Sequence, residues 1–136
     1  MTDLVNAMNV STSALKAQSA RMRVISENIA NANSTGTTPG SEPYQRQTIS
    51  FKDVFDPSLG THVVDINKYG VDPSPFKKRY EPAHPAADAQ GYVLLPNVKT
   101  SMELMDMREA QRSYEASVTS IESSRNLLIR TLDLLR

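Results

Sequence analysis

The residues that break helices are confined to one stretch of this 136-residue chain. All eight prolines and all five glycines lie between Gly36 and Pro96. Proline removes a backbone donor and clashes inside a helix, and glycine weakens one, so residues 36–97 are predicted to form turns and short strands. The flanks, residues 1–35 and 98–136, contain no such residue and are each predicted to form one long helix.

Both flanks carry a heptad pattern, in which seam positions follow each other by alternating steps of three and four. In the first flank the positions are Leu4, Met8, Ser11, Leu15, Gln18, Met22, Ile25 and Ile29. In the second they are Leu104, Met107, Gln111, Tyr114, Val118, Ile121, Arg125, Leu128, Leu132 and Leu135. A narrow seam must be buried against another helix. The predicted fold is therefore mainly α, an antiparallel and coiled-coil-like pair of long helices with a small β- and loop-rich central insert.

Short alternating runs in the insert predict strands. The candidates are Tyr44–Phe51, Thr61–Ile66, Phe76–Tyr80 and Tyr92–Leu95. The second helix has its own start signal, because Thr100 and Glu103 have the spacing of a capping box, with Asn97 as an alternative cap.

Two glutamines interrupt the predicted seams and could set their register. If Asn33 and Val98 lie at the same end of an antiparallel pair, Gln18 faces the neighbourhood of Ser113, within a turn of Gln111. A buried amide is tolerated when it finds a partner, and buried polar residues fix register in coiled coils. Gln18 and Gln111 are therefore register candidates; the alternative is that both face solvent or another subunit.

The polar interruptions also leave the seams weak, so the helices are expected to need partners beyond their own insert. Asn28, Asn31 and Asn33 are unusual at the end of a helix, because asparagine is a poor helix former. We expect Asn28 and Asn31 to bind neighbouring backbone in an assembly and Asn33 to end the helix. The alternative is a frayed helix end.

Composition argues against several other classes of function. Lys plus Arg equals Asp plus Glu at 15 each, so no broad basic surface for nucleic acid is expected. The basic run Phe76–Tyr80 is better explained as a charged strand edge. There is no cysteine, and His62 and His84 match no metal or hydrolase motif, so no enzyme, metal or cofactor is expected. No apolar run could insert in a membrane, and no cleaved secretory signal is expected at the N-terminus.

Several stretches in chain order resemble the flagellar rod and hook family, and within it the proximal-rod members. They are Ser13–Gln18, Arg21–Ser26, Asn28–Asn31, Pro43–Gln47, Asp72–Phe76, His84-Pro85, Gly91–Val98, and Met105, Glu109 and Tyr114–Ala116. The resemblance implies a structural subunit that leaves the cytoplasm through the flagellar type III export gate without a cleaved signal peptide. It then polymerises helically into the periplasmic rod, the drive shaft of the basal body.

The resemblance also implies partners and assembly residues. The partners would be other copies, other rod subunits, the adaptor between the MS ring and the rod, and the export gate in transit. The N-terminal assembly motif would be Ser26, Asn28, Ile29, Ala30, Asn31 and Asn33. The heptad pattern, and not the resemblance, gives the C-terminal assembly seam, which is Leu104, Met107, Tyr114, Val118, Ile121, Leu128, Leu132 and Leu135. The rival functions are a coiled-coil adaptor or export chaperone that binds partner helices, and a small hydrolase using His62 or His84.

Overall fold

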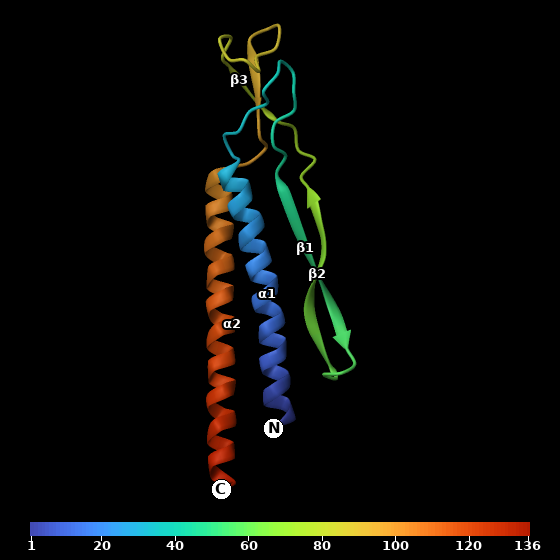
Figure 1. Ribbon diagram of the computed structural model, residues 1–136, viewed down its shortest axis with the longest axis vertical. Coiled ribbons are helices and arrows are strands. Elements are labelled where there is room, and N and C mark those ends of the chain that lie inside the picture. The colour runs from blue at the N-terminus through green and yellow to red at the C-terminus, as the bar shows by residue number, and fades with distance from the viewer. The chain divides into compact units, whose positions relative to one another are not determined.

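The computed structural model describes residues 1–136 and contains two long helices and four strands (Figure 1). In chain order these are α1 (Thr2–Ala30), β1 (Gln47–Asp56), β2 (Thr61–Val71), β3 (Lys77–Tyr80), β4 (Tyr92–Leu95) and α2 (Thr100–Leu134). Helices hold 47% of the residues and strands 21%, in two small antiparallel sheets. The prediction of a mainly α fold is therefore wrong, and the chain combines α and β structure. All four predicted strands exist, but β1 and β2 continue well past Phe51 and Ile66.

Backbone packing divides the chain into two compact units. Unit 1 comprises Met1–Met22, Ile49–Lys68 and Arg108–Arg136, and unit 2 comprises Arg23–Thr48 and Tyr69–Met107. Each helix and each strand of the β1–β2 hairpin contributes residues to both units.

In unit 1 the two helices run antiparallel (Figure 1). Ser11 Oγ is hydrogen-bonded to Ser120 Oγ at 3.1 Å, and Arg21 forms an ion pair with Glu109 at 3.6 Å. These contacts match the register that the sequence predicts. A different side of α1 faces the hairpin, where the backbone N–H of Val64 donates to Ser13 Oγ at 3.2 Å.

The face of α2 that is buried in unit 1 coincides only in part with the predicted seam. Ala110 is fully buried and Ser124 is 8% exposed, whereas the next residues along, Gln111 and Arg125, are exposed. The buried positions of α2 in unit 1 therefore carry small side chains, and the polar interruptions of the predicted seam on α2 are exposed.

The β1–β2 hairpin turns at Asp56–Gly60. Asp56 Oδ1 accepts hydrogen bonds from the N–H and hydroxyl of Ser58, and the N–H of Gly60 donates to Asp56 O at 2.9 Å. Gly60 has a φ of 63°, a left-handed conformation that glycine adopts without a Cβ penalty. The sequence DPSLG thus supplies both the side-chain acceptor and the flexible residue that the turn needs.

In unit 2, β3 pairs antiparallel with β4, with Lys77 opposite Leu95 and Tyr80 opposite Tyr92. Val93 is fully buried, while all four residues of β3 are exposed. Gly91 precedes β4 with a φ of 87°, and a Cβ there would lie 2.9 Å from the ring of Tyr80. Neither helix of the structure is long and apolar enough to cross a membrane.

Candidate functional site

Asn28 is buried in unit 2 and all its side-chain hydrogen-bonding capacity is used. It is 1% exposed. Its Nδ2 donates to Gln47 O (2.9 Å) and Glu103 Oε2 (3.3 Å), and its Oδ1 accepts from Gln47 N (2.9 Å) and the Tyr44 hydroxyl (2.7 Å). An amide has two donors and about two acceptor sites, so Asn28 is saturated. Its side chain pairs with both backbone groups of Gln47 as a neighbouring strand would.

Asn28 therefore binds the backbone of its own chain at Gln47. The predicted contact with a neighbouring subunit would need capacity that this side chain no longer has. Asn31, three residues later, bonds only the helix backbone, through Nδ2 to Glu27 O at 2.9 Å.

Glu103, in the first turn of α2, is a buried carboxylate at 1% exposure. Its Oε1 accepts a hydrogen bond from Nε of Arg46, a side chain that is 27% exposed. Arg46 also lies 3.6 Å from an oxygen of Asp72 and 3.9 Å from one of Asp106. A buried charge is costly unless it is paired and hydrogen-bonded, and here the guanidinium and the Asn28 amide provide that compensation.

Asn97 connects the same region to the segment before β3. Its Oδ1 accepts from the N–H of Arg46 (2.8 Å), and its Nδ2 donates to Asp72 O (3.0 Å) and Ser74 O (3.1 Å). We call Asn28, Arg46, Asp72, Asn97 and Glu103 the polar cluster. It ties the end of α1, the start of β1, the segment after β2 and the start of α2 together within unit 2. A cavity of about 510 Å³ opens beside it, with Lys77 and Lys99 also on its walls.

Two ionisable groups at the cluster are perturbed. Burial raises the pKa of Tyr44, and the negative charges of Glu27 and Glu103 act in the same direction. Hydrogen bonds from the hydroxyl and then the N–H of Ser74 lower the pKa of Asp72, and Arg46 adds to this effect. The cluster thus favours an ionised Asp72 and a neutral Tyr44.

We expect Ser74→Ala to raise the pKa of Asp72 part of the way to its usual value. The lost hydroxyl is the largest cause of the depression, while the N–H of residue 74 remains. Because the folded pKa is depressed, the stability contributed by Asp72 is present above the unfolded pKa and is lost as pH falls through the folded pKa. Ser74→Ala should therefore reduce that contribution. NMR titration of the carboxyl carbon measures the shift.

Ser58→Ala is a matched control, since Ser58 holds Asp56 in the same geometry. It should raise the pKa of Asp56 and leave that of Asp72 unchanged. An unchanged Asp72 pKa in Ser74→Ala would contradict the assignment.

Sequence reasoning did not find most of this cluster. The sequence predicts capping roles for Glu103 and Asn97, whereas in the structure both side chains bind Arg46. Arg46 lies in Pro43–Gln47, one of the stretches that carry the family resemblance, yet it is 57 residues from Glu103. The only hint in the sequence is that Arg46 lies in a motif typical of the family. Its position in the sequence does not identify Glu103 as its partner.

The remaining residues of the predicted N-terminal motif are spread over different environments. Ile29 and Asn31 are half-buried, whereas Ser26, Ala30 and Asn33 are exposed. Helix α1 ends at Ala30, and residues 31–33 form a turn, so the helix ends slightly before Asn33.

The predicted C-terminal seam is buried only in part. Met107, Val118, Ile121 and Leu128 are half-buried. The exposed members are Leu104 at 48%, Tyr114 at 36%, Leu132 at 47% and Leu135 at 73%. Other apolar side chains of α2 are exposed as well, namely Met102, Met105, Leu127, Ile129 and Leu134. The helix therefore presents more apolar surface than its contacts within the chain cover.

The side-chain oxygen of Gln18, one of the two register candidates, accepts no hydrogen bond from the other candidate, Gln111. Gln18 Oε1 is buried without a hydrogen-bond partner, and Gln111 is exposed. Their role in setting the register stays a prediction.

Each histidine side chain contacts neighbouring groups of its own unit. His62 Nδ1 lies 2.9 Å from Asp53 Oδ1, and its ring meets Phe55 edge-on. His84 Nδ1 accepts from the N–H of Ala86 at 3.0 Å, and its Nε2 lies 3.4 Å from Thr35 Oγ1. No group of three or more His, Cys, Asp or Glu side chains is arranged to hold a metal ion.

Two family models match the segments that supply the helices. The model described as "Flagella basal body rod protein" matches residues 8–37, and "Flagellar basal body rod FlgEFG protein C-terminal" matches residues 89–134. The first range includes Asn28 and the second Asn97 and Glu103, so both matched segments contribute to the polar cluster. These matches define the class as flagellar basal-body rod proteins.

Full-length relatives identify the particular member of that class. The chain is 46% identical to the flagellar basal-body rod protein FlgC of Agrobacterium fabrum over 100% of this chain and 98% of the relative. It is 40% identical to FlgC of Borreliella burgdorferi, covering 98% of each chain. It is 34% identical to FlgC of Bacillus subtilis, covering 95% of this chain and 96% of the relative. The chain belongs to the FlgC family and is a structural subunit of the flagellar basal-body rod. The resemblance predicted from the sequence is confirmed, and the adaptor or chaperone alternative is not favoured.

Proposed function

We propose that this subunit polymerises helically with its own copies and with other rod subunits, forming the shaft that transmits motor torque across the periplasm. The observation that carries the proposal is the apolar surface of α2. Isolated leucines on a surface are ordinary, but a run of exposed apolar side chains marks an interaction site. Leu127, Leu132 and Leu134 in the last turns of α2, and Leu135 just after it, are each at least 47% exposed.

The proposal assigns residues 1–35 and 98–136 to the rod core and residues 36–97 to an insert on that core. Ser26, Ala30 and Asn33 of the N-terminal motif are exposed and thus accessible to other subunits. Leu104, Tyr114, Leu132 and Leu135 offer the corresponding apolar contacts on α2. The saturated side chain of Asn28 has a different role, which is to hold the insert against the core.

The route into the rod belongs to the same proposal. We expect export from the cytoplasm through the flagellar type III gate without cleavage of a signal peptide, and attachment near the adaptor that joins the MS ring to the rod. Mass spectrometry of the subunit from purified basal bodies tests the first point. Recovery of a peptide beginning at or next to Met1 is expected, and a shortened N-terminus would contradict it.

We expect Leu132→Asp to abolish motility without unfolding the subunit. Leu132 is 47% exposed in the isolated chain, so a charge costs little there. Inside an apolar contact between subunits an unpaired carboxylate is expensive. The variant should be absent from basal bodies prepared after removal of hook and filament, and cells that express it should not swim.

Ser123→Asp is the matched control. It places the same charge at an exposed polar position of α2, and we expect it to leave motility unchanged. Normal swimming by Leu132→Asp would show that this part of α2 is not buried in the rod.

A further inference from the structure

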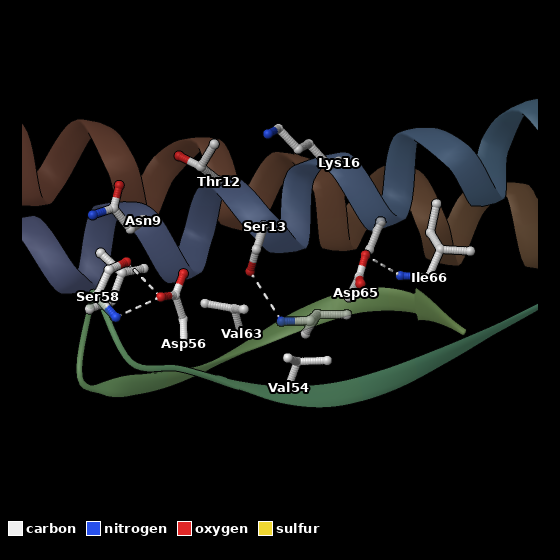
Figure 2. Close-up of a pocket in the computed structure, with 13 residues that line it drawn as sticks. Asn9, Thr12, Ser13, Lys16, Val54, Asp56, Ser58, Val63, Asp65 and Ile66 are labelled. Atoms are coloured by element: carbon white, nitrogen blue, oxygen red, sulfur yellow. Dashed lines mark hydrogen bonds between the residues drawn. The ribbon is translucent and has the colours of Figure 1, made fainter. Parts of the chain in front are cut away.

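A groove in unit 1 lies between α1 and the tip of the β1–β2 hairpin (Figure 2). Its volume is about 470 Å³. Val54 and Val63 extend into it from the two strands, and Lys16 lies on its helical side (Figure 2). Leu59 and Ile66 complete the apolar part of the wall. The hydrogen bond from Val64 to Ser13 holds helix and hairpin together across the groove (Figure 2).

Charged side chains surround this apolar surface. Lys16 is exposed and forms no ion pair within the chain. Asp56 and Asp65 each use Oδ1 for a neighbouring backbone N–H. Their Oδ2 atoms are not used in those bonds, although that of Asp65 lies 4.0 Å from Lys52 Nζ. The groove therefore offers an apolar centre, one cation and two carboxylates to a partner.

The end of α2 extends beyond the beginning of α1 in the same unit (Figure 1). Ser11 lies opposite Ser120, so Thr2, the first residue of α1, lies opposite about residue 129 in an antiparallel pair. Residues beyond that point have no part of α1 beside them. Leu134 and Leu135, exposed at 87% and 73%, belong to this overhang.

The overhang has the chemistry that the groove would bind. Leu132 and Leu135 match its apolar centre. Arg130 and Arg136 are exposed and can pair with Asp56 and Asp65, and Asp133 is exposed and can pair with Lys16. The groove carries two negative charges and one positive, and the end of α2 carries two positive and one negative. The two surfaces are therefore complementary in polarity as well as in sign of charge.

We propose that residues 127–136 of one copy of this chain, the end of α2 and the two residues after it, dock in the α1–hairpin groove of a second copy. Two different surfaces meet in this contact, so a docked pair still presents one free groove, on one copy, and one free helix end, on the other. Such heterologous contacts generate open helical assemblies when the rotation does not close into a ring. The inference rests on the proposed self-assembly and names the surfaces that carry it.

The absence of cysteine permits a direct test by cross-linking. Two full-length variants, Leu135→Cys and Val63→Cys, are purified separately, mixed under assembly conditions and oxidised. Disulfide formation requires the two Cα atoms within about 7 Å. We expect a disulfide-linked dimer of the two variants, formed at least tenfold faster than in two control mixtures. The controls are Leu135→Cys with Asp53→Cys, an exposed hairpin residue outside the groove lining, and Glu122→Cys with Val63→Cys.

Exchanging the charges of Lys16 and Asp133 tests whether these two residues pair in the docked contact. Lys16→Glu should slow cross-linking at least fivefold, and Asp133→Lys in the partner variant should restore most of the rate. Sedimentation of the unmodified chain, run in parallel, reports self-assembly.

Sedimenting assemblies without the cross-link would overturn the docking contact but leave the proposed function intact. Absence of any assembly would overturn the proposed self-association and this contact together. Equal rates in the test and control mixtures, or capture of Leu135→Cys by a site outside the groove, would also overturn it.

Discussion

Arg46→Met is expected to destabilise the subunit by about 3–5 kcal/mol, because it leaves the buried carboxylate of Glu103 without its cation. Glu103 is 1% exposed, and its Oε1 is bound by Arg46. The two other carboxylates near Arg46, those of Asp72 and Asp106, would also lose a neighbouring positive charge. The free energy of unfolding of the purified chain, measured in urea, gives the change.

The double variant Arg46→Met/Glu103→Met distinguishes the destabilisation caused by an unpaired buried charge from the net stabilisation that the intact ion pair provides. Apolar replacement of a buried ion pair is often close to neutral, so most of the lost stability should return. Arg79→Met is the matched control. Arg79 pairs with Glu81 at 3.0 Å, but both side chains are at least 40% exposed, and exposed pairs contribute about 0–1 kcal/mol. Equal losses of stability in Arg46→Met and Arg79→Met would show that the ion pair of Arg46 with Glu103 does not stabilise unit 2.

Asn28→Ala is expected to cost about 2–5 kcal/mol and to loosen the start of β1. The truncation removes four hydrogen bonds and leaves both backbone groups of Gln47 without that partner. Each buried polar group left unsatisfied costs about 1–3 kcal/mol. Urea unfolding gives the total cost, and amide exchange at Gln47, whose N–H is bound by Asn28, reports the local effect.

Asn31→Ala is the control for this substitution, because it removes the same side chain three residues later in the same motif. Asn31 makes one bond, to its own helix backbone, so its loss should cost no more than about 1 kcal/mol. Unchanged protection at Gln47 in Asn28→Ala would refute the assigned role. A greater loss of stability in Asn31→Ala than in Asn28→Ala would also contradict it, because it would assign the stabilising role to the half-buried Asn31.

The positions of the helices and turns could be predicted from the sequence because local chemistry determines them. The confinement of proline and glycine to residues 36–97 marks where helices cannot continue, and α1 and α2 end and begin near those limits. The run from Asp56 to Gly60 forms the hairpin turn that its residue types favour. The antiparallel direction of the helices agrees with the prediction, which placed Asn33 and Val98 at the same end of the pair (Figure 1).

The proportion of β structure was less predictable. The sequence pattern predicts β2 only as far as Ile66, since Asn67, Lys68 and Gly70 are poor strand formers. The strand nevertheless continues to Val71. Contacts outside the strand accompany this extension: Tyr69 accepts a hydrogen bond from Arg23 at 3.1 Å, and Asp72 donates its N–H to Arg46 O at 2.8 Å. Such tertiary contacts override a weak local preference.

The sequence by itself determined where the helices lie, which way they pair and which family the chain belongs to. Only the tertiary structure decided which face of α2 is buried and which partner Asn28 and Glu103 bind. A heptad pattern ranks positions by apolar character, whereas this helix buries Ala110 and Ser124 and leaves Leu132 and Leu135 exposed. Leucines reserved for another subunit look the same in a sequence as leucines of a core. Likewise, an amide or carboxylate carries no mark of its partner, because the partner is selected by distance in the folded chain and not by separation along it.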